Sequence, residues 1–444
     1  MNYKQLIVLI TILAWLPAQA CQTPAQAAEI GKKYPDWDFA NMMHAAHNQP
    51  YTGYKFKGTQ TCTGGMADQF PCMNIDLVGH LDLPNIGGGQ GSDSWGWKHE
   101  ASGRYFALVG RSNGTSFVEI TDPTNPVYIG NLPSEFSTSS WRDIKTYNGY
   151  AFIVADIIGN HGMQVFDLSK LLNVINMPAT FSADHVYRGG SLTQTHNIVI
   201  NEESGYAYLV GGTTCSGGIH MVNISNPLTP VFAGCFSSDG YTHDAQCLNY
   251  QGPDSDYTGR EICFASNVDT VTVVDVTDKS NPTMLSRTGY SGSQYTHQGW
   301  LTEDQRYFVF DDELDESRDN VNTRSLVIDF NDLDKPVFKG FHESSGISID
   351  HNQYIVGDYT YQANYTRGLR ILKLNDLSQS NMEEVAYFDT YPENDGLGFP
   401  GAWNVYPFFD NGLVMVSDIV RGVFILRPTL PSINDDIIFR DGFE

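Results

Sequence analysis

Positively charged residues are scarce in this chain. Its 444 residues include 26 Lys and Arg against 51 Asp and Glu, which gives a formal net charge of −25. Proteins that bind nucleic acid neutralise phosphates with clustered Lys and Arg, so this composition argues against a nucleic-acid partner. Charge repulsion keeps such an acidic chain in solution, and its negative field attracts cations.

Long apolar stretches are also absent after the first residues. One apolar run, residues 6–16, follows Lys4 and precedes an Ala-Gln-Ala segment at residues 18–20. This arrangement is typical of a secretory signal peptide, which we place at residues 1–27. The run is too short for a membrane span, and no later segment is long enough to cross a bilayer. A lipoprotein site at Cys21 is the alternative, although the residues before it fit such a motif poorly.

The motifs of several enzyme classes are missing. The sequence contains no Gly-x-Ser-x-Gly, no His-Glu-x-x-His and no phosphate-binding Gly-Lys-Ser/Thr loop. Long helical patterns are missing too, whereas Gly, Tyr and Phe are plentiful. This composition is typical of short strands joined by tight turns.

What the sequence does contain is a unit that recurs about seven times, at a spacing of roughly 44 to 56 residues. Each unit starts near a His or Trp and ends in an apolar strand followed by an Asp-like position and often a Pro turn. The ends of the clearest copies lie at residues 118–123, 222–227, 274–278 and 328–332. A fixed period of this length predicts an all-β fold, a seven-bladed β-propeller, which we place at residues 62–428.

The last predicted blade has no fourth strand of its own, because the chain turns into a tail at Pro428. An unassigned strand of the right type lies at residues 73–78. We therefore predict that this N-terminal strand completes blade seven and closes the ring. Residues 28–61 are predicted to form an extended lead-in. Residues 429–444 are either a sorting motif or a frayed end.

Six cysteines form three neighbouring pairs in the sequence. In an exported chain, an even number of cysteines predicts disulfides. We pair them by proximity and strand geometry, and reduced structural thiols are the alternative. The predicted disulfides are Cys62–Cys72, Cys215–Cys235 and Cys247–Cys263.

Histidines and tryptophans recur at the predicted blade starts. Because the innermost strand of each blade lines the central channel, these side chains are expected to converge at one mouth. Clustered imidazoles suit Zn²⁺, Cu²⁺ or another borderline metal, but hydrogen bonds that pin neighbouring blades together are the alternative role. The predicted mouth residues are His99, Trp141, Asp143, His196, His243, His297, His351 and Trp403. The predicted ligands of a transition metal are His196, His243, His297 and His351.

Two further sets belong to the same prediction. Carboxylates at the blade starts can supply oxygen ligands or hold imidazoles in one tautomer. Tryptophans there can form an aromatic floor for sugars or peptides, with core packing as the alternative. These sets are Asp143, Asp244 and Asp350, and Trp95, Trp97, Trp141, Trp300 and Trp403.

The densest acidic run lies at residues 311–319. Several carboxylates close together suit Ca²⁺, a hard cation, although the run lacks the Gly and the spacing of an EF-hand loop. A solvated acidic loop is the alternative. The predicted calcium ligands are Asp311, Asp312, Asp315 and Asp319.

Several segments resemble the choice-of-anchor B proteins, which are exported bacterial proteins with repeats of the LVIVD type. The resemblance covers residues 62–427 and implies export, a propeller-like fold and a variable C-terminal attachment or sorting signal. It implies no shared reaction. The final residues, 438–444, are similar to a short terminal motif on other exported proteobacterial proteins. The segments that carry the main resemblance are 62–72, 74–77, 95–97, 113–118, 141–145, 158–166, 296–301 and 368–372.

Together these features predict an extracellular or cell-surface protein that acts as a binding or interaction module through its channel mouth. Its expected partners are the export machinery and an extracellular ligand or surface partner that the sequence does not identify. One alternative is a metal-dependent hydrolase or lyase that uses the histidine cluster. Another is a structural envelope protein stabilised by calcium.

Overall fold

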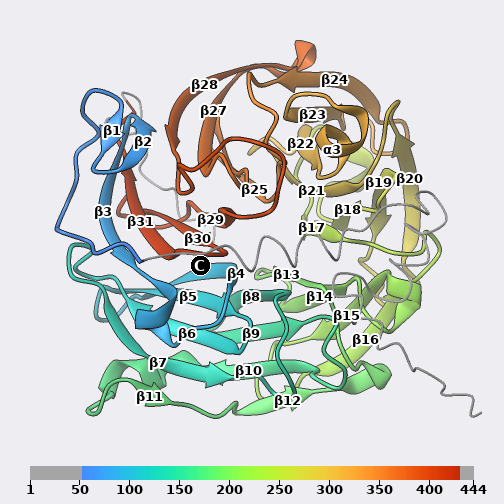
Figure 1. Cartoon of the computed structure of the whole chain (residues 1–444). Coiled ribbons are helices and arrows are strands. Elements are labelled where there is room, and N and C mark those ends of the chain that lie inside the picture. Colours follow the sequence, from blue (N-terminus) through green and yellow to red (C-terminus); the bar gives the residue numbers. More distant parts are fainter. Residues whose placement is uncertain (1–52, 431–444) are drawn as a thin grey trace, which may run out of the picture.

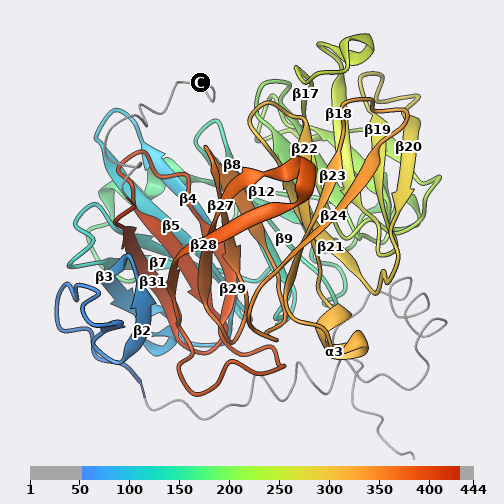
Figure 2. The ribbon, with the colours of Figure 1, turned by 90° about the horizontal axis from the view of Figure 1, so that it is seen from above.

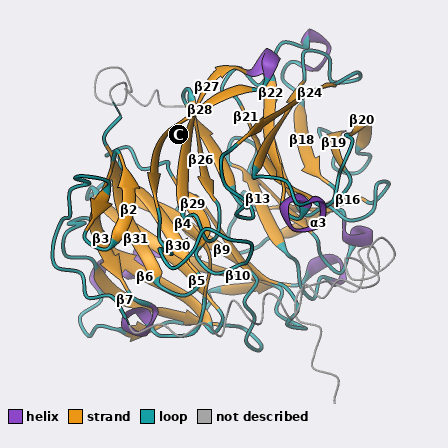
Figure 3. Cartoon of the chain, turned by 45° about the horizontal axis from the view of Figure 1, so that its top comes forward, coloured by secondary structure: helices purple, strands orange, loops and turns teal. Residues whose placement is uncertain are grey.

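Seven β-sheets stand around one central axis in the computed structural model, which describes residues 53–430 (Figure 1). Strands dominate, and the helices are single short turns (Figure 3). No helix in this described part is both long and apolar enough to cross a bilayer. The predicted signal peptide, Cys21, most of the lead-in and nearly all of the tail lie outside the described residues. The prediction of a seven-bladed β-propeller is confirmed.

The first three blades follow the chain in order, and each begins with its innermost strand. Blade 1 contains β4 (Gly91–His99), β5 (Arg104–Arg111), β6 (Gly114–Glu119) and β7 (Val127–Pro133). Blade 2 contains β8 (Arg142–Tyr147), β9 (Tyr150–Ala155), β10 (Met163–Asp167) and β12 (His185–Tyr187). Blade 3 contains β13 (Asn197–Asn201), β14 (Tyr206–Val210), β15 (Ile219–Asn223) and β16 (Val231–Phe236).

The remaining blades keep the same antiparallel order. Blade 4 contains β17 (Asp244–Asn249), β18 (Glu261–Ser266), β19 (Thr270–Asp275) and β20 (Thr283–Gly289). Blade 5 contains β21 (Thr296–Leu301), β22 (Tyr307–Asp312), β23 (Arg324–Asp329) and β24 (Val337–Glu343). Blade 6 contains β25 (Gln353–Val356), β26 (Tyr359–Ala363), β27 (Leu369–Asp376) and β28 (Asn381–Phe388). Blade 7 contains β29 (Ala402–Tyr406), β30 (Val414–Asp418), β31 (Gly422–Pro428) and β3 (Ile75–Leu81).

Short elements extend this frame. Three strands lengthen blades 6 and 1: β1 (Met66–Ala67) and β2 (Phe70–Met73) beside β28, and β11 (Ala179–Thr180) parallel to β7. Helix α3 (Asp315–Asp319) lies on one face of the propeller (Figure 2). The 3₁₀ turns are η1 (Leu83–Ile86), η2 (Leu168–Asn173), η3 (Gly189–Ser191), η4 (Cys215–Gly217), η5 (Ser255–Tyr257) and η6 (Leu377–Gln379).

The N-terminal strand β3 closes the ring. It pairs antiparallel with β31, with Leu77 opposite Leu426 and Leu81 opposite Val423 (Figure 1). The predicted closure is therefore confirmed, although the strand begins two residues later than expected. The lead-in residues just before it also contact this blade, because Gln60 exchanges backbone hydrogen bonds with Leu77.

A register shift of the kind a β-bulge makes recurs between the third and fourth strands of six of the seven blades. Two of these bulges place a glycine against the turn of the next blade. A Cβ on Gly79 would lie 2.1 Å from the carbonyl oxygen of Pro123, and a Cβ on Gly234 would lie 1.6 Å from that of Lys279. The Pro-containing turn between the third and fourth strands thus serves as a contact between blades.

The core is divided among the spaces between blades. In the described residues, seven hydrophobic clusters each join neighbouring blades around the ring. For example, Phe152 of blade 2 packs in one cluster with Ile198 and Leu209 of blade 3. An eighth cluster gathers Trp141, Trp403 and other residues from several blades at one end of the channel. This end is where the candidate site lies.

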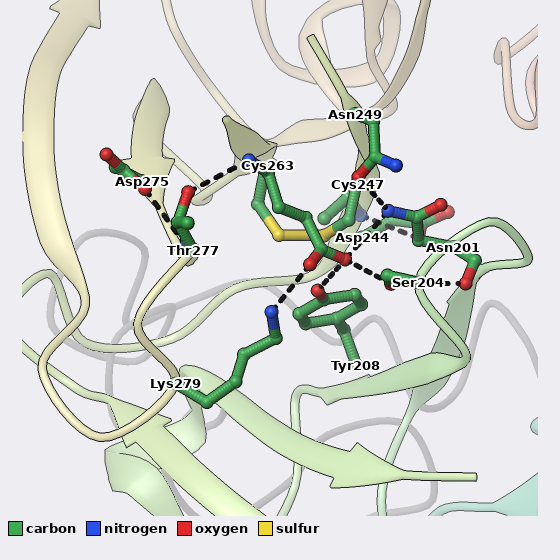
Figure 4. Close-up of a disulfide and its surroundings, with 12 residues drawn as sticks. Asn201, Ser204, Tyr208, Asp244, Cys247, Asn249, Cys263, Asp275, Thr277 and Lys279 are labelled. Atoms are coloured by element: carbon green, nitrogen blue, oxygen red, sulfur yellow. Dashed lines mark hydrogen bonds and ion pairs between the residues drawn. A yellow bond between two sulfur atoms is a disulfide. The ribbon is translucent and has the colours of Figure 1, made fainter. Parts of the chain in front are cut away.

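The three predicted disulfides are confirmed, and two of them lie in adjacent blades. Cys247 on β17 faces Cys263 on β18, with their Cα atoms 4.0 Å apart (Figure 4). Beside this disulfide, donors from blade 3 and from Lys279 meet at the buried carboxylate of Glu261. These donors are Asn201 Nδ2 at 2.7 Å, Ser204 Oγ at 2.6 Å, Lys279 Nζ at 2.6 Å and the Tyr208 hydroxyl (Figure 4).

Candidate functional site: the channel mouth

The innermost strands begin at the same end of the channel, and their first residues surround a small hollow there. We call this hollow the mouth. Four imidazoles follow one another around it, with ring centroids 4.6 Å apart for His196 and His243, 4.1 Å for His243 and His297, and 4.4 Å for His297 and His351. The residues that line the mouth are Asp93, Trp141, Arg142, His196, Asn197, His243, His297, His351, Asn352 and Trp403.

Each imidazole is anchored through Nδ1. In His243 and His351 the Nδ1–H donates to a backbone carbonyl oxygen, that of His297 at 2.9 Å and that of Trp403 at 2.5 Å. A carbonyl oxygen only accepts hydrogen bonds, so the proton sits on Nδ1 and leaves a lone pair on Nε2. His196 and His297 have a carboxylate in the same place.

The two carboxylates that orient imidazoles are Asp156, 3.1 Å from His196 Nδ1, and Asp311, 3.0 Å from His297 Nδ1. The sequence prediction had assigned this role to Asp143, Asp244 and Asp350. The alternative role for the histidines is also realised in part, since the bond from His243 to His297 joins blade 4 to blade 5 and that from His351 to Trp403 joins blade 6 to blade 7.

Burial keeps three of these imidazoles, those of His243, His297 and His351, neutral. It lowers the pKa of His351 to about 3, and together with the neighbouring histidines it holds the pKa values of His243 and His297 well below the ordinary value. Neutral imidazole is the form that binds metals. On the mouth wall, burial also lowers the pKa of Arg142 to about 9, and its Nε and Nη2 have no hydrogen-bond partner among residues 53–430.

Glu313 reaches the mouth from the loop after β22. Its carboxylate oxygens lie 3.9 Å from His297 Nε2 and 3.9 Å from His351 Nε2, and the three ligand atoms lie within 4.8 Å of one another. The hydroxyl of Tyr365 donates to Glu313 Oε1 at 2.7 Å. Burial raises the pKa of Glu313 to about 8. Two imidazoles and one carboxylate are a ligand set found in zinc and non-haem iron sites.

A layer of carboxylates and amides lies just below the imidazoles. Each of the seven blades contributes one Asp, Asn or Gln at or near the start of its innermost strand, and several of these side chains bond to one another across blades. For example, Asn352 Nδ2 and Asn404 Nδ2 donate to the two oxygens of Asp93 at 3.0 and 2.9 Å. The members of this polar layer are Asp93, Asp143, Asn197, Asp244, Gln298, Asn352 and Asn404.

Lys145 balances part of this negative charge. Its Nζ donates to Asp143 Oδ1 at 2.5 Å. Burial alone would lower the pKa of Lys145, but Asp143, Asp93 and Asp244 raise it above its ordinary value. Burial and the charge of Asp143 raise the pKa of Asp244 to about 7. The polar layer therefore already contains its own cation.

Aromatic side chains fill the channel beyond the polar layer. Tyr354 contacts Trp95 and Trp300 from two other blades, with ring centroids 5.9 and 5.0 Å apart. Phe408 contacts the same two tryptophans, at 5.9 Å each, and Lys145 lies 4.4 Å from the ring of Trp95. The channel is therefore closed on this side, and the mouth is a blind hollow.

One predicted mouth residue lies elsewhere. His99 is at the end of β4, not at its start, where its Nδ1 bonds to the hydroxyl of Ser102 in an exposed turn. Blade 1 begins earlier than predicted, and Asp93 occupies the position that the other blades give to the polar layer. Asp143 also belongs to that layer and not to the mouth wall. Trp141 and Trp403 line the mouth as predicted.

The predicted calcium ligands do not form one cluster. The Asp312 carboxylate accepts hydrogen bonds from the backbone N–H groups of Gln294 and Tyr295, at 2.6 Å each. The Asp315 carboxylate accepts two from the guanidinium of Arg324. Asp311 holds His297, whereas Asp319 accepts from the Gln294 amide at 3.0 Å. The run is also not a solvated loop, because all of its carboxylates up to Glu316 are buried.

Sequence reasoning missed Glu313, Asp156 and all of the polar layer except Asp143 and Asp244. Glu313 and Asp156 reach the mouth from loops between the second and third strands, so no local pattern places them there. The polar layer had a visible signal, since the residue after His or Trp at the blade starts is Asn197, Asp244, Gln298, Asn352 or Asn404.

Fold and site together define a closed seven-bladed β-propeller with a blind, histidine-lined channel mouth. Among solved structures, the chain is similar to hydrazine synthase of Kuenenia stuttgartiensis, with a TM-score of 0.53 and 11% identity over 78% of this chain and 97% of that chain. It is also similar to the β-propeller domain of Cps50 (Swd1) from Myceliophteria thermophila, with a TM-score of 0.49 and 9% identity over 78% of this chain and 99% of that domain.

A periplasmic gluconolactonase of Pseudomonas aeruginosa is similar as well, with a TM-score of 0.46 and 12% identity over 76% of this chain and 98% of that chain. At such low identities the likeness concerns the fold alone, and propellers serve many unrelated functions. No family model matches the chain, and no curated protein matches it in sequence.

Proposed function

We propose that this chain is an exported or cell-surface binding module that takes its ligand in the channel mouth. The observation that carries the proposal is the blind hollow, in which four anchored imidazoles and two tryptophans from different blades face one small space. Concave sites with a few convergent polar groups are where proteins bind small ligands. The ligand is therefore a small molecule or ion, or the tip of a larger partner.

Three disulfides support an oxidising compartment, and the resemblance to the choice-of-anchor B proteins supports export. The same proposal includes cleavage of the signal peptide and a sorting role for the tail. A fractionation experiment on cells that express the full chain would test it. Retention of the uncleaved chain in the cytoplasm would contradict export.

Binding at the mouth is tested by thermal unfolding in a library of sugars, amino acids, carboxylic acids and metal salts. A ligand at about 100 times its Kd should raise the unfolding free energy of the wild-type protein by about 2.7 kcal/mol. His243→Ala should lose this stabilisation, whereas His99→Ala, which removes an exposed imidazole away from the mouth, should keep it. Equal stabilisation of wild type and His243→Ala would place the ligand elsewhere.

A metal-dependent hydrolase or lyase is the second candidate. It is favoured by the meeting of His297, Glu313 and His351 beside the open hollow, which would leave a metal position for water or substrate. The test is hydrolysis of ester, lactone and phosphoester substrates by zinc-loaded protein. Turnover that vanishes in Glu313→Gln would support it, whereas turnover that persists in this variant would contradict it.

A further inference from the structure

We propose that the mouth binds one divalent transition-metal ion through His297 Nε2, His351 Nε2 and the carboxylate of Glu313. This inference rests on the proposed binding function and deepens it, because it names the class of ligand that the same site takes. It also differs from the sequence prediction, which used four histidines and no carboxylate. We call His297, His351 and Glu313 the metal triad.

The distances within the metal triad fit an ion with little movement. Glu313 Oε2 lies 3.9 Å from His297 Nε2, Glu313 Oε1 lies 3.9 Å from His351 Nε2, and one ligand atom from each of the three residues lies within 4.8 Å of the other two. At zinc–ligand bonds of about 2.1 Å, ligand atoms in a tetrahedral site stand about 3.4 Å apart. The gap to close is about half an ångström between each carboxylate oxygen and its own imidazole, and at most about 1.4 Å for the widest pair of ligand atoms, which is within the reach of side-chain rotation.

Each ligand of the triad is oriented by a partner behind it. Asp311 bonds to Nδ1 of His297 at 3.0 Å, and the carbonyl oxygen of Trp403 accepts from Nδ1 of His351 at 2.5 Å. Tyr365 donates to Glu313 at 2.7 Å. Partners of this kind fix the tautomer and direction of metal ligands, and a carboxylate behind an imidazole is common in zinc sites. The triad thus has the supporting contacts of a metal site as well as its ligands.

The framework around the triad is rigid and leaves room for further ligands. His297 is the second residue of an inner strand in blade 5, and His351 lies two residues before the neighbouring inner strand in blade 6. Strand pairing fixes the backbone close to both histidines, at Thr296, Gly299 and Gln353. Both imidazoles also line the hollow. Three protein ligands beside an open space is the arrangement of metal sites that accept an exogenous ligand.

The donor set selects the type of ion. Imidazole nitrogen suits zinc, iron, nickel and copper, whereas calcium and magnesium prefer oxygen ligands. The carboxylate supplies negative charge in a buried site where Asp311 and Asp312 lie close by in the sequence and are also buried. A divalent cation would offset the repulsion among these groups.

The test uses the purified full chain, stripped with a chelator and titrated with ZnCl₂ by calorimetry. Zinc should bind with one ion per chain, and Co²⁺ in its place should give the visible absorption of a low-coordinate nitrogen–oxygen site. His297→Ala, His351→Ala and Glu313→Gln should each weaken zinc binding by at least about a hundredfold. His99→Ala, the exposed control, should bind zinc as the wild type does.

Asp311→Asn and Tyr365→Phe keep the three ligands and should weaken zinc binding by about tenfold. Circular dichroism and thiol counts establish that each variant is folded with its disulfides formed. Zinc binding that survives all three ligand substitutions, or that is lost in His99→Ala, would overturn the assignment, as would a wild-type protein that binds no zinc.

Failure of the metal inference is distinguishable from failure of the proposed binding function. If wild-type protein binds no zinc but an organic ligand stabilises it and not His243→Ala, the mouth is a binding site without a metal. If zinc binds through the triad and no further ligand is found, the metal inference stands by itself. If neither zinc nor an organic ligand binds at the mouth, both proposals are wrong.

Discussion

Glu261 concentrates charge and hydrogen bonding where blades 3 and 4 meet. Its buried carboxylate accepts hydrogen bonds from Asn201, Ser204 and Tyr208 of blade 3 and pairs with Lys279 of its own blade. The Lys279 side chain is itself only 10% exposed. Removing one member of such a group leaves the others without a partner in a poorly hydrated place.

We therefore expect Glu261→Ala to lower the free energy of unfolding by about 3–5 kcal/mol. Glu203→Ala is the matched control, because Glu203 is exposed and accepts one hydrogen bond from Asn249; it should change stability by less than about 0.5 kcal/mol. Urea denaturation followed by tryptophan fluorescence measures both values. Similar losses in the two variants would show that the Glu261 network does not hold the blades together.

His80 makes the closing blade sensitive to acid. The imidazole is buried between β3 and β31, its Nε2–H donates to the carbonyl oxygen of Arg421 at 2.9 Å, and its Nδ1 has no partner in the described residues. Burial, and then the charge of Arg421, lower the pKa of His80 to about 3. The unfolded chain takes up the proton more readily, with a pKa of about 6.5.

Stability should therefore be complete above about pH 6.5 and fall as the pH drops toward 3, by up to about 1.4 kcal/mol per pH unit from this residue. His80→Gln can keep a donor to Arg421 and has no proton to gain. Its unfolding free energy should fall less steeply over the same pH range, as measured by urea titrations at several pH values. Parallel curves for the two proteins would contradict this assignment.

At the scale of elements, the bulges and the turns form a repeated contact. Gly79 and Gly234 sit at bulges where the next blade's turn comes so close that no Cβ fits. Gly79→Ala should therefore push blade 1 away from blade 7 and cost about 1–3 kcal/mol. Gly289→Ala, with its nearest atoms at 3.7 Å and ordinary backbone angles, is the control and should be close to neutral. Thermal unfolding compares them, and equal midpoints would exclude the proposed contact.

Elements with a local signature could be predicted from the sequence, and those without one could not. The strand ends at 118–123 and 222–227 have such a signature, because an apolar strand runs into a Pro turn, and the disulfides could be predicted because the paired cysteines are close in the chain. The predicted start of blade 1 was wrong because this blade has no His at the start of its innermost strand. His99 matched the residue type but lies at the other end of β4, since Asp93 holds the repeat position.

The candidate site shows the same division. The four imidazoles come from one repeat position, so the sequence was sufficient to place His196, His243, His297 and His351 together. Glu313 belongs to the loop between the second and third strands of blade 5, and only the folded chain brings it to His297. The acidic residues around Glu313 suggested a calcium site. In the structure Asp312 and Asp315 are buried and already accept hydrogen bonds, from the backbone N–H of Tyr295 and from the Arg324 side chain.

At the scale of the whole molecule, the fold depends on the union of its two chain ends. Strand β3 covers the edge of β31, which would otherwise present unpaired backbone groups. A chain that begins at Asn74 keeps this strand, whereas a chain that begins at Asp82 lacks it. We expect the first to unfold cooperatively, with a midpoint lowered by the loss of the Cys62–Cys72 disulfide and of the buried Phe70, and the second to aggregate. Light scattering and calorimetry compare them, and a monomeric, cooperative second chain would disprove the closure role.

The aromatic layer of Trp95, Trp300, Tyr354 and Phe408 closes one end of the channel, so a ligand can reach the imidazoles only through the mouth. Whatever enters among the imidazoles has to leave by the route it came. A second protein that binds over the mouth would therefore keep a bound ligand in place and also prevent further ligand molecules from entering. The same covering protein would then control both ligand association and ligand dissociation. The lifetime of the bound ligand would depend on that protein more than on the depth of the hollow.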